Sequence, residues 1–273
     1  MISPYDTIQC EPGEGGVTVL TLNRPEKKNA YTWQMCQELC AALADFMADD
    51  AQRVLVLTGA GQAFCAGGDV ESDPDRYWEG ASGRELGHGM AMRESMHAVV
   101  RALHRVDKPT IAMIDGPAIS GGLTLALLCD VRIASEQARL GDASLRFALL
   151  PDEGGAWVFS RFMRPDLARR MVLGSQIYGA DTACELGLVT QVVPRDELVD
   201  TVMAMATGMA AAAPLASRLA KRMMRFAERA SLDETLSFTE LTVTIGNESP
   251  DVREGVAAFL ERRPARFGPG RSS

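Results

Sequence analysis

The stretch Asp115-Gly-Pro-Ala-Ile-Ser-Gly-Gly-Leu-Thr-Leu-Ala-Leu-Leu-Cys-Asp130 follows a short apolar run at Ile111–Ile114. The run predicts a buried strand, Gly-Pro predicts a turn, and Gly121–Leu128 predicts a buried helix. Free N–H groups at a helix N-terminus carry the positive end of the helix dipole, and glycine lets an oxygen approach them closely. The stretch therefore predicts either an oxygen-binding helix start or a glycine-packed helix with a purely structural function.

A second glycine segment, Gly61-Gln-Ala-Phe-Cys-Ala-Gly-Gly-Asp69, directly follows the apolar run Val54–Thr58. A dinucleotide-binding fingerprint does not fit, because Phe64 stands where its third glycine belongs. The sequence also has no GKS or GKT of a phosphate-binding loop. A plain tight turn remains an alternative interpretation. Two such strand-to-glycine elements can each supply one N–H group to a single oxygen, which is the arrangement of an oxyanion hole.

The rest of the chain alternates strands and helices and then becomes helical, which predicts an α/β fold. From Arg195 onward we expect helices with a break at Pro214, so residues 1–195 form the predicted core and 196–273 a helical region. The other predicted elements are a strand at Val17–Leu22, a helix from Thr32, its N-cap, to about Ala48, a helix near Met90 and a strand at Val131–Ala134.

The composition limits the classes of protein. The chain has 273 residues, a net charge of -8, six cysteines without a CxxC pair and three histidines. We therefore expect reduced thiols in the cytoplasm, no metal site and no disulfide framework. The acidic balance argues against nucleic-acid or membrane-surface binding. The sequence shows neither an apolar run long enough to span a membrane nor a secretory signal.

Several short motifs occur along the chain in a fixed order and spacing. They are Asn23-Arg-Pro, Asn29-Ala30, Phe64-Cys-Ala-Gly-Gly-Asp69, Lys108-Pro109, Asp115-Gly116, Ser120-Gly-Gly122, Cys129-Asp130, Leu150-Pro151, Gly154-Gly155, Gly187-Leu-Val189 and Phe259-Leu-Glu-Arg-Arg-Pro264. Together they resemble the crotonase superfamily, also called the enoyl-CoA hydratase/isomerase family. The resemblance runs from about Val17 to Phe267 and implies a ββα spiral core with a C-terminal helical trimerisation region. It also implies an acyl-CoA thioester substrate, no cofactor beyond the CoA of that substrate, and self-association as a homotrimer or a dimer of trimers.

The same resemblance assigns roles to individual residues. The amides of Gly68 and Gly121 are expected to hold the thioester oxygen. Phe259 and Arg262 are expected near the nucleotide end of CoA, contributed by the same or a neighbouring subunit. The remaining candidate substrate-binding residues are Lys27, Lys28, Ala30, Ala66, Gly67, Asp69, Val70, Thr124 and Ser144.

The sequence departs from the hydratases of this family at their two catalytic glutamates, whose positions hold Thr124 and Ser144. A hydroxyl cannot replace a carboxylate as a general base without another base beside it. Asp152 and Glu153 follow shortly after, and some relatives carry a catalytic carboxylate at the position of Asp152. Both acids are therefore candidate catalytic residues, although acids are also common in a turn that follows a proline.

The sequence does not decide the roles of the segment Glu71–Gly89 and of two histidines. Glu71–Gly89, which contains Tyr77 and Trp78, lacks a clear period and suggests a binding loop or lid. His97 and His104 lie seven residues apart on a polar helical stripe, which favours a solvated face. His97 also lies near the position of an active-site histidine in dehalogenase-like relatives.

These observations favour an enzyme that stabilises a thioester enolate and moves an enoyl-CoA double bond with the single carboxylate of Asp152. Hydrolysis or C–C cleavage of a cyclic or branched acyl-CoA, assisted by Glu153 or His97, is the first alternative. Hydration despite the missing glutamates is the second. A catalytically silent protein that binds CoA thioesters is the alternative from another class.

Overall fold

Two β-sheets form the centre of the molecule, and the computed structural model describes residues 5–71 and 88–268. The larger sheet has the order β1-β2-β3-β4-β6-β9; β1 runs antiparallel to β2 and the other neighbours are parallel. Its strands are β1 Ile8–Pro12, β2 Val17–Leu22, β3 Val54–Gly59, β4 Thr110–Ile114, β6 Val131–Ser135 and β9 Gln191–Val193. The smaller sheet has the order β5-β7-β8, with β5 Pro117–Ile119, β7 Arg139–Gly141 and β8 Ile177–Gly179.

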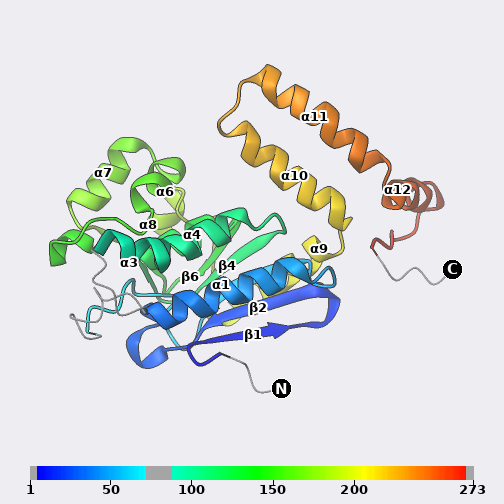
Figure 1. Cartoon of the computed structure of the whole chain (residues 1–273). Coiled ribbons are helices and arrows are strands. Elements are labelled where there is room, and N and C mark those ends of the chain that lie inside the picture. The colour runs from blue at the N-terminus through cyan, green and yellow to red at the C-terminus, as the bar shows by residue number, and fades with distance from the viewer. Residues whose placement is uncertain (1–4, 72–87, 269–273) are drawn as a thin grey trace.

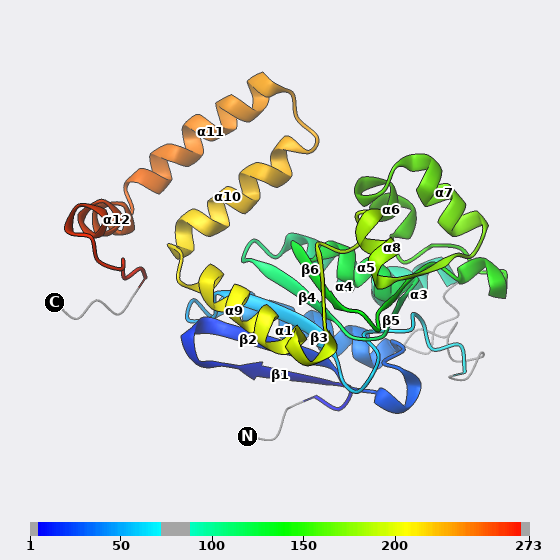
Figure 2. The same cartoon turned by 180° about the vertical axis from the view of Figure 1, so that it is seen from behind.

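Helices cover both faces of the larger sheet, with α1 on one face and α9 on the other (Figures 1 and 2). Both faces need a cover because they are apolar. In strand β3, for example, successive side chains point to opposite faces of the sheet. Leu55 and Leu57 join the cluster beneath α1, whereas Val54 and Val56 join the cluster beneath α9. The helices are α1 Trp33–Ala48, α3 His88–Glu94, α4 Met96–Arg105, α5 Gly121–Leu128, α6 Gly155–Phe162, α7 Pro165–Leu173, α8 Ala180–Glu185, α9 Leu198–Ala210, α10 Pro214–Ala227, α11 Leu232–Asn247 and α12 Pro250–Glu261.

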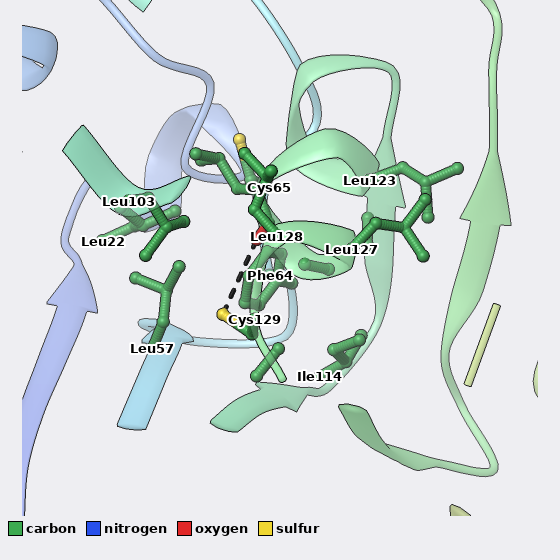
Figure 3. Close-up of a cluster of buried hydrophobic side chains, with 14 of the residues drawn as sticks. Leu22, Leu57, Phe64, Cys65, Leu103, Ile114, Leu123, Leu127, Leu128 and Cys129 are labelled. Carbon is green, nitrogen blue, oxygen red and sulfur yellow. Dashed lines mark hydrogen bonds between the residues drawn. The ribbon is translucent and has the colours of Figure 1, made fainter. Parts of the chain in front are cut away.

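Helix α5 is buried along its whole length, and this fixes the position of its first residues. Its leucines pack against Phe64 and against side chains from the larger sheet and α4 (Figure 3). Full burial of each leucine side chain contributes about 1.5–3 kcal/mol. The N-terminus of α5 is therefore held by apolar packing on all sides rather than by a capping side chain, since Ser120 makes no side-chain cap hydrogen bond.

The predicted α/β fold is confirmed, as are the predicted strands and the helix at Gly121–Leu128. Thr32 caps α1, because its side chain accepts a hydrogen bond from the Met35 N–H at 3.2 Å. The six cysteines are free thiols, as expected. The predicted loop at Glu71–Gly89, with Tyr77 and Trp78, lies mostly outside the described residues.

The C-terminal helices differ from one another in their packing. Helix α9 buries Leu198, Val202 and Ala206 against the larger sheet, whereas α10, α11 and α12 extend away from it (Figure 1). The predicted division at residue 195 stays a prediction, although the buried face of α9 belongs to the core. The break at Pro214 is confirmed, but further breaks occur before α11 and α12, where Ser231 and Ser249 act as N-caps.

The base of α10 is tied to the core by charged groups. Asp107, which is buried, accepts a hydrogen bond from Arg218 Nε at 2.8 Å and one from Arg222 Nε at 2.7 Å. Lys221 is also buried and forms an ion pair with Asp130. No single described helix meets the length and hydropathy test for a membrane span; a pair broken by 103°, Arg195–Ala210 with Pro214–Ala227, passes it jointly.

Candidate active site

Two glycine loops that are far apart in the sequence meet beside α5. Single-residue parallel bridges join Cys65 to Ala118 and Tyr31 to Gly68. The Ile119 N–H donates to the Cys65 oxygen at 2.9 Å, and the Tyr31 N–H donates to the Gly67 oxygen at 2.9 Å. These backbone hydrogen bonds fix the loop after β3 against the start of α5.

The two loops approach each other so closely that a side chain at residue 67 would fill the space between them. A Cβ added to Gly67 would lie 3.2 Å from the Ile119 oxygen and 3.9 Å from the Gly121 nitrogen. Gly67 also has a φ of +98°, a conformation that favours glycine. Among the described residues, no protein acceptor takes a hydrogen bond from the N–H of Gly68 or of Gly121. Gly68 lines the cavity described below, whereas Gly121 is buried and follows the lining residue Ser120.

A cavity of about 600 Å³ opens beside these loops. It is lined by most of the residues that the sequence analysis selected: Lys27, Lys28, Ala30, Ala66, Gly67, Gly68, Asp69, Val70, Ser144, Asp152 and Glu153. Its wall also contains apolar side chains that the sequence analysis did not select: Ile119, Phe147, Leu149 and Leu150. An acyl chain and a polar thioester can both find complementary surface in such a cavity.

Glu153 brings a buried carboxyl to the inner end of this cavity. It is 7% exposed, and its Oε1 accepts a hydrogen bond from the Tyr31 hydroxyl at 3.0 Å. Burial and the nearby Asp152 raise the pKa of Glu153 to about 7. Glu153 also lies against α5, since a Cβ on Gly121 would be 3.0 Å from its Oε1. Asp152 is half-buried and faces the cavity.

A third carboxyl, Asp142, lies behind the cavity wall and was missed by the sequence analysis. It is fully buried, and burial raises its pKa. The Ser144 hydroxyl lies 3.2 Å from both Asp142 Oδ2 and the Ser120 hydroxyl. Ser120 has a φ of +50°, a strained conformation for a residue with a side chain. This network connects Ser144 to the residue that precedes Gly121.

Charged residues at the mouth of the cavity have different partners. Lys27 and Lys28 are exposed, and Lys27 forms an ion pair with Glu71 that raises the lysine pKa. Asp69 is buried and accepts a hydrogen bond from Arg24 Nη2 at 2.8 Å. Asp69 therefore stabilises the loop, and the charge of Lys27 is paired with that of Glu71.

Thr124 has a buried hydroxyl without a partner among the described residues. It lies one turn along α5 from Gly121 but does not line the cavity. Its neighbour is Gly154, since a Cβ added there would lie 3.6 Å from Thr124 Cγ2. An unsatisfied buried hydroxyl is costly, so this position favours an additional small polar partner such as a water molecule.

Phe259 and Arg262 are exposed near the end of α12 and do not line the cavity of their own chain. The solvated face predicted for the two histidines is wrong, because both are half-buried. His97 Nε2 lies 2.7 Å from the main-chain oxygen of Asp152. His104 packs edge-on against Trp157 at 5.3 Å, and its burial lowers its pKa.

The parallel sheet, the paired glycine loops and the carboxyl groups around one cavity define an α/β protein with the crotonase fold. A sequence profile of the enoyl-CoA hydratase/isomerase family matches residues 13–270. The chain belongs to this family.

Relatives with known names agree with the assignment but differ in the reactions that they are named for. The chain is 35% identical to 1,2-epoxyphenylacetyl-CoA isomerase of Escherichia coli, over 93% of this chain and 95% of the relative. It is 34% identical to a putative enoyl-CoA hydratase of Thermus thermophilus, over 95% and 100% of the two chains. Its structure is similar to an enoyl-CoA hydratase of Bacillus anthracis, with a TM-score of 0.87 and 28% identity over 96% and 99% of the chains.

Proposed function

We propose that this protein binds an acyl-CoA thioester, stabilises its enolate and isomerises an enoyl-CoA double bond. The N–H groups of Gly68 and Gly121 hold the thioester oxygen, and Asp152 is the acid and base. The substrate brings the CoA, and no further cofactor takes part. Asp152 removes a proton from one carbon and returns it to another, so one carboxylate suffices.

The observation that carries this proposal is the position of the acids. The hydratase glutamate positions hold Thr124 and Ser144, whereas Asp152 and Glu153 line the cavity beside the glycine loops. Thr124 has no carboxylate or imidazole partner among the described residues that would turn its hydroxyl into a base. The Escherichia coli relative is also named an isomerase of a CoA thioester, although the substrate in its name is an epoxide.

The test is a panel of saturated, 2-enoyl, 3-enoyl and cyclic acyl-CoAs in heavy water, followed by mass spectrometry. We expect deuterium next to the thioester and a shifted double bond. Asp152→Asn should remove most turnover and leave the affinity for a saturated acyl-CoA nearly unchanged, whereas the exposed Asp181→Asn should change neither. The addition of one water would instead identify a hydratase or hydrolase, and binding without exchange would identify a silent binder.

Self-association is part of the proposal. Helices α10, α11 and α12 expose large apolar side chains, among them Leu241, Phe259, which is 81% exposed, and Leu260. An apolar surface of this kind favours contact with a second copy of the chain. We propose a homotrimer or a dimer of trimers in which Phe259 and Arg262 approach the cavity of a neighbouring subunit. Light scattering would measure the mass, and a monomer would contradict this part of the proposal.

A further inference from the structure

The Tyr31–Glu153 pair has no role in the single-carboxylate mechanism. Tyr31 is 3% exposed, and its hydroxyl donates to Glu153 Oε1 although the two residues are 122 positions apart in the sequence. Both side chains lie close to Gly121, the first residue of α5, whose N–H group is proposed to hold the thioester oxygen. A Cβ on Gly121 would lie 2.7 Å from Tyr31 Cε1 and 3.0 Å from Glu153 Oε1. The pair therefore occupies the space that glycine leaves open at residue 121.

The surroundings of Glu153 oppose a negative charge on it. The groups that act on Glu153 are Asp152, Asp142, Tyr31 and the buried thiol of Cys65. None of them is a cation, and burial raises the pKa of the Cys65 thiol to about 12, which keeps it neutral. An ionised Asp152 makes a second carboxylate beside it unfavourable, because like charges in one site do not ionise together easily. Two hydrogen bonds favour the ionised form, one donated by the Tyr31 hydroxyl and one by the backbone of Glu153 itself.

We propose that Glu153, in its neutral form, is a third hydrogen-bond donor to the thioester oxygen, and that Tyr31 is the positioning residue that holds it beside Gly121. The inference rests on the proposed function. The Tyr31 hydroxyl donates to Oε1, so the neutral form proposed here carries its proton on Oε2 of a residue that lines the cavity. A carboxylic acid kept neutral by its site is a strong donor to an enolate oxygen.

The proton and electron balance closes without a transfer from Glu153. Asp152 takes a proton from a carbon of the acyl chain, and the electron pair moves onto the thioester oxygen. Glu153 donates a hydrogen bond to that oxygen and keeps its proton. When Asp152 returns its proton to another carbon, the electron pair moves from the thioester oxygen back into the acyl chain. Asp152 is then a carboxylate again, and Glu153 is still protonated. An ionised Glu153 would instead repel the enolate, so activity should fall as the pH rises through the pKa of Glu153.

Glu153→Gln is the decisive variant, because glutamine keeps an N–H donor and an oxygen for Tyr31 but cannot ionise. We expect its kcat/KM at about pH 6 to stay within several-fold of the wild type, and its alkaline loss of activity to disappear. Tyr31→Phe/Glu153→Leu removes both polar groups together and leaves no buried hydroxyl unpaired. Loss of one donor to the oxygen should lower kcat about 100-fold in this double variant.

Tyr31→Phe tests the positioning role separately. Removing its hydrogen bond raises the pKa of Glu153, so the alkaline limb of the activity profile should move to higher pH, whereas Tyr178→Phe should leave the profile unchanged. If Glu153→Gln loses as much activity as the double variant, Glu153 transfers a proton and the inference is overturned. If the activity of the wild type and of Glu153→Gln falls at the same alkaline pH, the proposed role of Glu153 is overturned as well.

Binding gives a readout that does not depend on turnover. The affinity for butyryl-CoA, measured by calorimetry, should weaken above about pH 7 in the wild type but not in Glu153→Gln, because only the wild type gains a charge beside the carbonyl oxygen. A wild type without turnover or deuterium exchange would contradict the proposed function. Equal pH dependence of binding in both proteins would contradict the role of Glu153 alone.

Discussion

The buried carboxyl of Glu153 should make the stability of the protein fall with rising pH. The folded-state pKa of about 7 lies above the ordinary value of 4.5. The folded protein therefore holds this proton more tightly than the unfolded chain does. The contribution to the free energy of unfolding is fully present below about pH 4.5 and is lost as the pH rises through about 7, and the difference corresponds to about 3 kcal/mol. Between about pH 5 and pH 8.5 the loss is about 2.5 kcal/mol.

Glu153→Gln isolates this contribution, because glutamine has no proton to lose. Urea unfolding followed by circular dichroism, at one protein concentration, gives the free energy of unfolding at both pH values. The variant should gain about 2.5 kcal/mol relative to the wild type on going from about pH 5 to pH 8.5. The exposed Glu185→Gln removes the same formal charge and should show no such gain. A wild type and a Glu153→Gln variant with parallel pH dependence would refute the buried, neutral carboxyl.

Three further changes test other parts of the structure. Gly121→Ala places a Cβ 2.7 Å from the Tyr31 ring, so we expect a loss of kcat/KM of at least about 10-fold; an active variant would show that the helix start can shift. Asp107→Asn weakens the ion pairs to Arg218 and Arg222, and amide hydrogen exchange should then become faster in α10 than in α1. Thr32→Ala removes the N-cap of α1 and should lower the free energy of unfolding by about 1 kcal/mol in urea titrations. The exposed Thr182→Ala is the control and should change it much less.

Local patterns were sufficient to predict the elements of the core. The run Val54–Thr58 predicted a buried strand, and β3 has that form because helices cover both sides of the sheet. Thr32 predicted the start of α1 through its capping side chain. In both cases the information lies within a few adjacent residues. The two glycine segments raised the possibility of a shared oxygen site, which stays a prediction; the backbone bridges show that the two loops meet.

The electrostatic character of the site was not accessible from the sequence. Glu153 was selected because it is an acid near the positions of the missing glutamates, but its hydrogen bond to Tyr31 joins residues 122 positions apart. Asp142 was not selected, because a single acid after a strand resembles any turn residue. The extra breaks among the C-terminal helices were not predicted, although Ser231 with Glu234 three residues later is the sequence signature of the capping box at the start of α11.

The two proposed oxygen-binding groups are peptide N–H groups on bridged loops, whereas the acids stand on a separate segment at residues 151–154. Every amino acid except proline supplies an N–H group, whereas Asp152 holds and moves a proton through its side chain alone. Changes confined to Asp152 should therefore alter where protons move without erasing thioester recognition. This separation makes the scaffold a practical starting point for laboratory evolution of new acyl-CoA reactions.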